Sequence, residues 1–264
     1  MKFISIIGYD RSGTTFMGSY YTHFTKNVFY AGEIDKAIQI LKSTSDQIVV
    51  CSCGKPYPDC PVWGQIKKSI SSGELKNLKD IVFRLQAITG AEIILDTSKQ
   101  LDRLKEYSEI FKDQFYTIHI KRNPKGVILS RMKNRKRRVK EKSHPKPFIA
   151  RRYNMMMIYD SLEWTYRNFI LEQIKVRDRN LELTYDFLPN ELPNKLIAFN
   201  NDHDIAVDES KITNHILWGD KRRTNFDKNI RLNSSWQTQL NTFQKITVDL
   251  LTWPLRSLKN YRFK

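Results

Sequence analysis

The chain has 264 residues, of which 40% are hydrophobic, so it can bury one sizeable core, and its 10 Gly and 9 Pro exclude a collagenous or low-complexity protein. Its 45 Lys and Arg against 28 Asp and Glu give a net charge of +17, which favours an anionic ligand or partner. Three cysteines, an odd number, argue against a disulfide scaffold and favour a reducing compartment.

The first apolar run, at residues 3–7, is too short to cross a membrane, and no small-residue cleavage site follows it. We therefore expect a cytoplasmic protein without a membrane span.

Short apolar runs alternate with helical patterns along most of the chain. Strands are predicted at residues 3–7, 28–30, 91–95, 115–120 and 181–184, and helices at residues 15–24, 34–42, 75–88, 101–111, 124–135, 153–176 and 235–251. This alternation is typical of a parallel sheet covered by helices on both faces. Since no Gly- or Ser-rich linker divides the chain, we expect one α/β domain over residues 1–264, with a P-loop-like central parallel β-sheet.

A basic segment at residues 133–152 interrupts this alternation, because Lys and Arg crowd together there and Pro145 and Pro147 follow. We interpret it as an insertion or lid, mobile until a ligand orders it. It can shield a cofactor, receive an anionic acceptor, touch nucleic acid, or be a solvated helix face. The apolar spacing of the next helix, at residues 153–176, predicts that its charged residues face outward.

The turn after the first predicted strand has the pattern of a phosphate loop, in which backbone N–H groups and a helix N-terminus surround an anion. Gly8 and Gly13 stand at the loop's ends. A nucleoside triphosphatase has Lys after the second Gly, whereas Thr14 and Thr15 follow here and the cation, Arg11, comes two residues earlier. The loop suits one phosphate with a neighbouring group better than a chain of β and γ phosphates.

A second anion-binding pattern follows the predicted strand at residues 115–120. Arg122 comes at the strand end, and Ser130 lies two turns into a helix that Pro124 begins. The guanidinium of Arg122 can hold a phosphate bidentately, and the hydroxyl of Ser130 can bind the same group.

Both motifs resemble those of the sulfotransferases that use 3'-phosphoadenosine 5'-phosphosulfate (PAPS). The family's 5'-phosphosulfate loop has Lys or Arg before Ser-Gly-Thr-Thr, and its 3'-phosphate motif has Arg at a strand end, then Asn or Asp before Pro, then Ser one short helix later. The resemblance implies a PAPS-binding set of Arg11, Ser12, Gly13, Thr14, Thr15, Arg122 and Ser130.

Three further segments are similar to this family, so that the resemblance extends over nearly the whole chain. Residues 51–63 resemble a cysteine-containing stretch of the bacterial-type members, and residues 96–99 resemble an Asp-Ser-Ser-Lys segment. Residues 219–223 resemble a C-terminal Gly-Asn-x-x-Arg, with Asp where Asn is usual. The resemblance implies that Arg222 or Arg223 closes over the 3'-phosphate.

Transfer of a sulfuryl group needs a cation near the sulfur, a base for the acceptor's proton, and a held leaving group. Arg11 is the candidate cation. Glu33, after the second strand, resembles the Glu of carboxylate-using branches; its alternative is an acid favoured by the helix dipole. Asp96 is a reserve base and Lys99 a second cation, and their alternatives are a helix N-cap and a surface lysine.

Metal binding is not expected. Cys51, Cys53 and Cys60 can give three thiolates, but they lack a Cys-x-x-Cys pair and no fourth ligand is evident, so we interpret them as a reduced, compact loop near the acceptor. His119 lies in a predicted buried strand and is interpreted as a satisfied core residue. The other histidines show no metal-ligand spacing: His23, His144, His203 and His215.

These observations predict a sulfotransferase that moves a sulfuryl group from PAPS to a hydroxyl or amine of a small-molecule acceptor and releases adenosine 3',5'-bisphosphate, with no metal required. An anionic compound, a sugar or a specialised metabolite suits the acceptor, and no specific nucleic acid is expected. The first alternative is a P-loop kinase, which lacks its Lys after Gly13 here. The second is a nucleic-acid-binding protein, suggested by the charge of +17. The sequence leaves the acceptor and the oligomeric state open.

Overall fold

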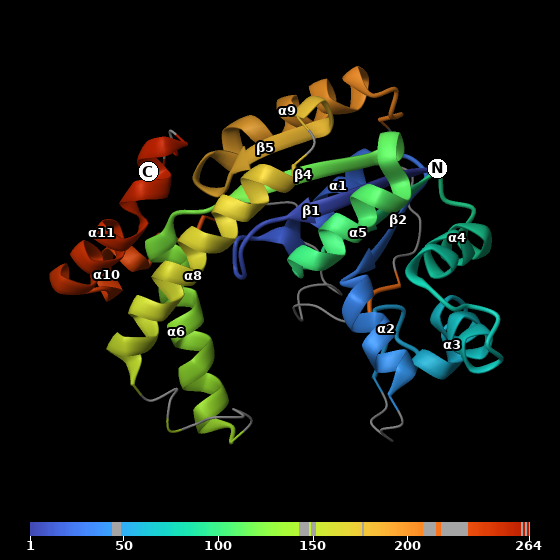
Figure 1. Ribbon diagram of the computed structural model, residues 1–264, viewed down its shortest axis with the longest axis horizontal. Coiled ribbons are helices and arrows are strands. Elements are labelled where there is room, and N and C mark those ends of the chain that lie inside the picture. Colours follow the sequence, from blue (N-terminus) through green and yellow to red (C-terminus); the bar gives the residue numbers. More distant parts are fainter. Residues whose placement is uncertain are drawn as a thin grey trace.

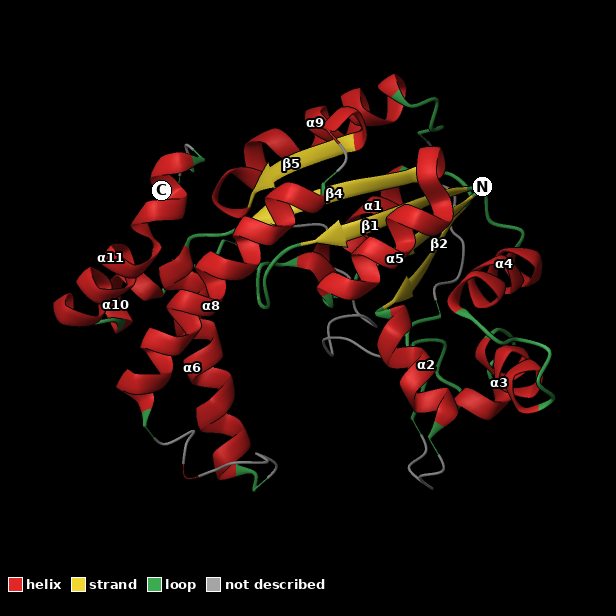
Figure 2. Cartoon of the chain, in the orientation of Figure 1, coloured by secondary structure: helices red, strands yellow, loops and turns green. Residues whose placement is uncertain are grey.

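Five strands lie side by side in one parallel sheet of a computed structural model, which confirms the predicted α/β fold class (Figure 2). Their order is β2-β3-β1-β4-β5. The strands are β1 (Lys2–Ile7), β2 (Val28–Gly32), β3 (Ile93–Asp96), β4 (Phe115–Lys121) and β5 (Asn180–Thr184). The structure describes residues 1–43, 49–142, 148, 152–175, 177–207, 215–217, 232–259, 261 and 263.

Helices cover both faces of this sheet (Figure 1). They are α1 (Thr14–Phe24), α2 (Ile34–Lys42), α3 (Trp63–Ser71), α4 (Leu78–Thr89), α5 (Leu101–Phe111), α6 (Pro124–Lys140), α8 (Tyr153–Ile174), α9 (Leu188–Asp202), α10 (Trp236–Gln239) and α11 (Thr242–Leu258). The sequence did not predict α3 or α9. The predicted helix at 235–251 is wrong as one element, because Asn241 begins a new helix there with a capping box.

The alternation of side chains along β1 divides the core between the two faces of the sheet. Phe3 packs on the face covered by α4 and α5, where its ring stacks on Phe111 at 4.4 Å. Ile4 and Ile6 pack on the opposite face, against side chains of α1 and α9. Because β1 is buried on both faces, its sequence is a nearly continuous run of apolar residues.

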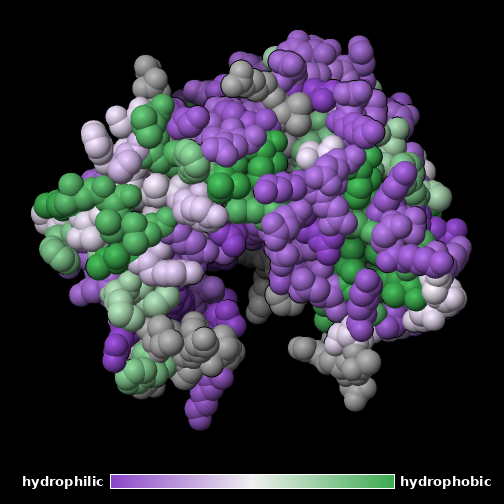
Figure 3. Space-filling model, viewed as in Figure 1, coloured by the Kyte–Doolittle hydropathy of each residue, from purple (hydrophilic) through white to green (hydrophobic). Residues whose placement is uncertain are grey.

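Helix α8 buries acidic side chains that the sequence pattern placed on the outside. Its acidic residue Asp160 is fully buried, while Tyr159 and Leu162 are exposed. The inward acids are held by the arginines of α6, because Arg135 forms a bidentate ion pair with Asp160. The prediction that the charged residues of this helix face outward is therefore wrong. Exposed apolar side chains also gather over α11 (Figure 3).

The basic segment predicted at 133–152 begins as part of a regular helix. Residues 133–140 form the last turns of α6, and Arg135 is held there by its ion pair with Asp160. The following residues 143–147 and 149–151, with both prolines, lie outside the described residues.

Helix α6 follows β4 and lies beside α8, whereas α2 follows the edge strand β2 and lies beside α3 (Figure 1). The surface is hollowed between these two groups, and hydrophilic residues form most of the visible wall (Figure 3). Among the described residues, no helix combines the length and the apolar character that crossing a membrane requires.

Candidate active site

The phosphate loop joins β1 to α1 as the sequence predicted. Gly8 allows a close approach, since a Cβ atom there would lie 2.8 Å from the carbonyl oxygen of Ile120. Gly13 is the residue before α1 and has φ of 99°, a left-handed conformation that favours glycine. Arg11 also has a positive φ, of 70°. The loop thus brings Ser12, Thr14 and Thr15 to the start of the helix, where free N–H groups favour an anion.

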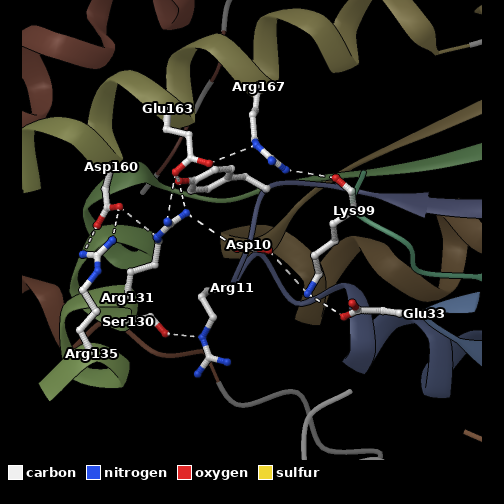
Figure 4. Close-up of polar contacts among 11 residues, drawn as sticks. Asp10, Arg11, Glu33, Lys99, Ser130, Arg131, Arg135, Asp160, Glu163 and Arg167 are labelled. Atoms are coloured by element: carbon white, nitrogen blue, oxygen red, sulfur yellow. Dashed lines mark hydrogen bonds and ion pairs between the residues drawn. The ribbon is translucent and has the colours of Figure 1, made fainter. Parts of the chain in front are cut away.

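The two predicted anion-binding motifs meet at this loop. The Arg11 Nε donates a hydrogen bond to the Ser130 Oγ at 3.1 Å (Figure 4). The Arg122 Nη1 donates to the backbone oxygen of Arg11 at 2.6 Å. Strands β1 and β4 are neighbours, with Ile7 opposite His119, so the segments that follow them leave the sheet together. The parallel pairing therefore joins motifs that are far apart in the sequence.

Arg122 is held in place by an aromatic ring that sequence reasoning missed. Its guanidinium carbon lies 4.2 Å from the ring centroid of Tyr185, directly after β5. The same ring leaves little space for a side chain at position 13, because a Cβ atom added to Gly13 would lie 3.2 Å from it. Arg122 is only 9% exposed, and this burial lowers the pKa of its guanidinium. An aromatic residue at a strand end was the available signal for Tyr185.

A lysine and two carboxylates lie on the other side of the loop. The Lys99 Nζ is 3.0 Å from the Glu33 Oε1 and 3.7 Å from the Asp10 Oδ1 (Figure 4). Glu33 is 8% exposed and directly precedes α2. The structure therefore brings the predicted Glu33 and Lys99 beside the phosphate loop, and it adds Asp10.

Asp96 is placed differently from Glu33, because its carboxylate is enclosed by hydrogen bonds. Its Oδ1 accepts from the Ile34 backbone N–H at 3.0 Å and from the Ser98 hydroxyl at 2.8 Å, and its Oδ2 accepts from the Ser98 backbone N–H at 2.9 Å. Asp96 is fully buried, and this burial outweighs the hydrogen bonds and raises its pKa to about 7. The arrangement ties the end of β3 to the start of α2, directly after Glu33.

An ion-pair network behind the loop joins α6 and α8, and the sequence analysis did not identify it. The Arg131 guanidinium lies 3.1 Å from both the Asp160 and the Glu163 carboxylates, and it also contacts the hydroxyl of Tyr9. That hydroxyl donates to Glu163 at 2.8 Å. Because Tyr9 belongs to the phosphate loop, the network fixes the loop against both helices.

The network lies beside a pocket that carries much positive charge. The pocket has a volume of about 240 Å³ and is lined by Asp10, Arg11, Arg131, Asn134, Arg135 and Arg138. Of these arginines, Arg131, Arg135 and Arg138 belong to α6, the helix that begins shortly after Arg122. This helix therefore also lies beside Arg11 of the phosphate loop. This concentration of guanidinium groups suits an anionic ligand.

Two predicted residues, Arg222 and Arg223, lie outside the described residues. His119 is fully buried, as predicted, but neither of its ring nitrogens has a hydrogen-bond partner among the described residues. Its Nδ1 lies 3.5 Å from a carboxylate oxygen of Glu172, which the lysines 121 and 175 also contact. Burial, assisted by the nearby ammonium groups, lowers the pKa of His119 to about 4.

This buried histidine predicts a loss of stability in mild acid. In the unfolded chain His119 takes up a proton near pH 6.5, whereas in the folded protein it does so near pH 4, so falling pH favours unfolding across this interval. We expect His119 to account for up to about 3 kcal/mol of the decrease in the free energy of unfolding. Urea unfolding of the wild type and of His119→Leu at several pH values measures it.

The pKa of Glu172 lies below the pH interval of this experiment. Burial opposes its ionisation, but hydrogen bonds from Lys175, Tyr261 and Lys121 outweigh this and lower its pKa to about 2. Its contribution is thus lost only at lower pH, below the usual pKa of a glutamate, and in both proteins alike. Equal losses of stability between pH 6.5 and 4 in the wild type and in His119→Leu would contradict the assignment.

Comparison with known proteins defines the class of the fold. No protein-family model matches the chain, and no curated protein matches its sequence. Solved structures of sulfotransferases share its architecture, so the chain has the P-loop-like sulfotransferase fold, as its motifs predicted.

Three of these structures are similar over nearly their whole length. The sulfotransferase domain from the curacin biosynthetic pathway has a TM-score of 0.67 at 14% identity, covering 100% of this chain and 99% of that one. Mouse sulfotransferase SULT7A1, complexed with PAP, gives 0.58 at 14% identity and 99% and 89% coverage. The sulfotransferase domain of the Synechococcus PCC 7002 olefin synthase gives 0.56 at 16% identity and 100% and 96% coverage.

Proposed function

We propose that the protein transfers a sulfuryl group from PAPS to a hydroxyl or amine of a small-molecule acceptor in the cytoplasm. The observation that carries this proposal is the meeting of the two motifs, because Arg11 contacts both Ser130 and Arg122. A ligand with phosphate groups at two ends needs two anion sites on one surface, and the pairing of β1 with β4 supports this assignment because it brings the two motifs together. The mouse sulfotransferase of the same fold was solved with PAP, which has two phosphates.

The described residues fit such a ligand. In the proposal, the loop from Arg11 to Thr15 binds the 5'-phosphosulfate through backbone N–H groups, hydroxyls and the Arg11 guanidinium. Arg122 and Ser130 bind the 3'-phosphate, with Arg222 or Arg223 completing the site. The stacking of Arg122 on Tyr185 supports this, since it holds the guanidinium plane ready for bidentate contact.

Glu33 is the proposed general base. PAPS, when bound, supplies the sulfuryl group, and adenosine 3',5'-bisphosphate leaves as the bond from sulfur to the bridging oxygen breaks. The Glu33 carboxylate takes the proton of the acceptor as the new bond to sulfur forms. Its contact with Lys99, at 3.0 Å, orients it and keeps an ammonium next to the place where the charge develops. Lys99 and Arg11 supply the positive charge, so the transfer step requires no metal.

Ligand-dependent stability tests this function against the two alternatives. Thermal unfolding is measured with adenosine 3',5'-bisphosphate, with ATP and magnesium, and with duplex DNA. We expect only the bisphosphate to stabilise the protein, by about 2.7 kcal/mol at a hundredfold excess over its dissociation constant. Stabilisation by ATP alone would favour a kinase, and stabilisation by DNA alone would favour a nucleic-acid-binding protein.

The acceptor is then sought directly. Cell extract is incubated with the protein and PAPS, and mass spectrometry searches for compounds that have gained one sulfuryl group. Omission of PAPS is the control for compounds already sulfated in the extract.

A further inference from the structure

Three cysteines and one histidine from distant parts of the chain gather at one point. The ligand atoms of Cys51, Cys53, Cys60 and His215 all lie within 4.8 Å of one another. The Sγ atoms of Cys51 and Cys60 are 3.7 Å apart, and the Nδ1 of His215 is 3.1 Å from the Sγ of Cys60 and 3.9 Å from that of Cys51. The cysteine spacing gives no sign of the fourth ligand because His215 lies far along the chain from the cysteines.

These distances match those around a tetrahedral zinc ion. With Zn–S bonds of about 2.3 Å and Zn–N bonds of about 2.0 to 2.1 Å, two ligand sulfurs lie about 3.8 Å apart and a sulfur and a nitrogen about 3.5 Å apart. The observed sulfur–sulfur separation is 3.7 Å, and the two sulfur–nitrogen separations, 3.1 and 3.9 Å, lie on either side of the ideal value. The ligand atoms of Cys51, Cys60 and His215 are therefore close to three corners of such a tetrahedron, and the Sγ of Cys53 lies within 4.8 Å of each of them.

The backbone on both sides of the cluster is held by its own hydrogen bonds. Cys51 begins a tight turn in which the Gly54 N–H donates to the Cys51 oxygen at 2.9 Å. Ser52 pairs with Ile216 twice, through its backbone N–H at 3.0 Å and through its hydroxyl oxygen, which accepts at 2.8 Å. The cysteine loop and the segment with His215 are thus joined independently of any ligand, so a preformed site is presented to the ion.

Trp63 provides a second layer around the cluster. Its backbone N–H donates to the Sγ of Cys60 at 3.5 Å, as expected for a thiolate ligand, and its indole N–H donates to the His215 backbone oxygen at 2.7 Å. Outer partners of this kind fix the orientation of metal ligands. Trp63 itself is completely buried.

We propose that Cys51, Cys53, Cys60 and His215 bind one structural zinc ion. Three thiolates and an imidazole form one of the usual ligand sets of structural zinc, and soft sulfur ligands disfavour magnesium and calcium. Four protein ligands leave no open position for a water or substrate, so the ion fastens the cysteine loop to the segment at 215–217 and takes no part in transfer. Binding releases the thiol protons to solvent.

A second group of residues with metal-binding side chains differs from the cysteine cluster because its charges are already balanced. His119, Glu172 and Glu182 also lie close together. The ammonium groups of Lys121 and Lys175 contact both glutamates, however, at distances that include 2.9 Å from Lys121 to Glu172. Those lysines already balance the carboxylates, whereas no lysine or arginine of the described residues forms a hydrogen bond with the sulfur atoms of the cysteine cluster.

Metal analysis of the purified full chain tests the proposal. We expect one zinc per chain in the wild type, and almost none in His215→Ala. His215→Cys is the matched variant, since it replaces imidazole by a fourth thiolate and should retain zinc. His23→Gln, changed in the last turn of α1 outside the cluster, should keep the wild-type content.

Two further measurements decide the question if a variant fails to fold. Cobalt exchanged into the wild type should give the thiolate-to-cobalt absorption and the strong visible bands of a tetrahedral site. A chelator should lower the thermal unfolding midpoint of the wild type. The proposal is overturned if the wild type holds no zinc with three titratable thiols, holds iron instead, or shows a disulfide between Cys51 and Cys60 by mass spectrometry of unreduced peptides.

Discussion

Glu33→Gln is expected to lower the rate of sulfuryl transfer by about 100- to 10,000-fold, the usual contribution of a general base. The amide keeps the size of the side chain and an oxygen that can accept from Lys99, which lies 3.0 Å from Glu33, but it cannot take a proton. Affinity for adenosine 3',5'-bisphosphate should change little, since Glu33 is assigned to the acceptor's proton. Steady-state kinetics and calorimetry on the same preparations measure the two quantities.

Two variants make this result interpretable. Glu106→Gln removes a partly exposed carboxylate of α5 that pairs with Arg103, and it should retain the wild-type rate. Asp96→Asn should mainly reduce stability, because Asp96 is fully buried and joins β3 to α2. An active Glu33→Gln together with a folded but inactive Asp96→Asn would transfer the role of base to Asp96. Activity in both variants would mean that catalysis depends on the orientation of the two substrates and on Arg11.

Arg122→Ala is expected to weaken binding of adenosine 3',5'-bisphosphate by about 10- to 150-fold, the equivalent of a charge-assisted contact of 1.5 to 3 kcal/mol. Ser130→Ala should weaken it only about 2- to 10-fold, because its uncharged hydroxyl offers the phosphate one hydrogen bond, whereas the guanidinium offers two together with its positive charge. Isothermal titration calorimetry measures both.

Arg122 also supports the phosphate loop, so its contribution to structure must be separated from its contribution to binding. Arg122→Lys keeps the positive charge but loses the planar contact with Tyr185 and the bidentate geometry, and it should give an intermediate affinity. Arg137→Ala removes an arginine of α6, the helix that begins shortly after Arg122, and it should bind normally because its side chain is 61% exposed. Equal affinity of the wild type and a folded Arg122→Ala would remove the assignment to the 3'-phosphate.

Local patterns predicted most of the secondary structure. Helices α2 and α5 have the bounds that the apolar spacing indicated, because each turns one apolar stripe toward the same hydrophobic core. Helix α9 was missed since Pro189 and Pro193 lie within it, and Pro193 is tolerated only because tertiary packing supports the helix. In α8 the apolar stripe indicated the wrong face, because ion pairs with α6 outweigh side-chain hydrophobicity at Asp160.

Some residues of the candidate site belong to a short local motif, whereas others join the site only through contacts between distant segments. Arg11, Arg122 and Glu33 were found because each follows a strand within a short motif. Tyr185 and His215 could not be found by spacing, since each joins its partners only through the order of the strands or the packing of distant segments. Residues that contribute through such contacts have no periodic signal in one sequence.

The central position of β1 also constrains how this protein folds during synthesis. Of the five strands, β1 is translated first, yet it pairs only with β3 and β4, which follow much later in the chain. Until they emerge from the ribosome, the strand's peptide groups have only water as partners, and its apolar side chains stay uncovered. A nascent chain that ends before Asp96 therefore carries an unpaired, aggregation-prone segment, and chaperones rather than the sheet must shield it.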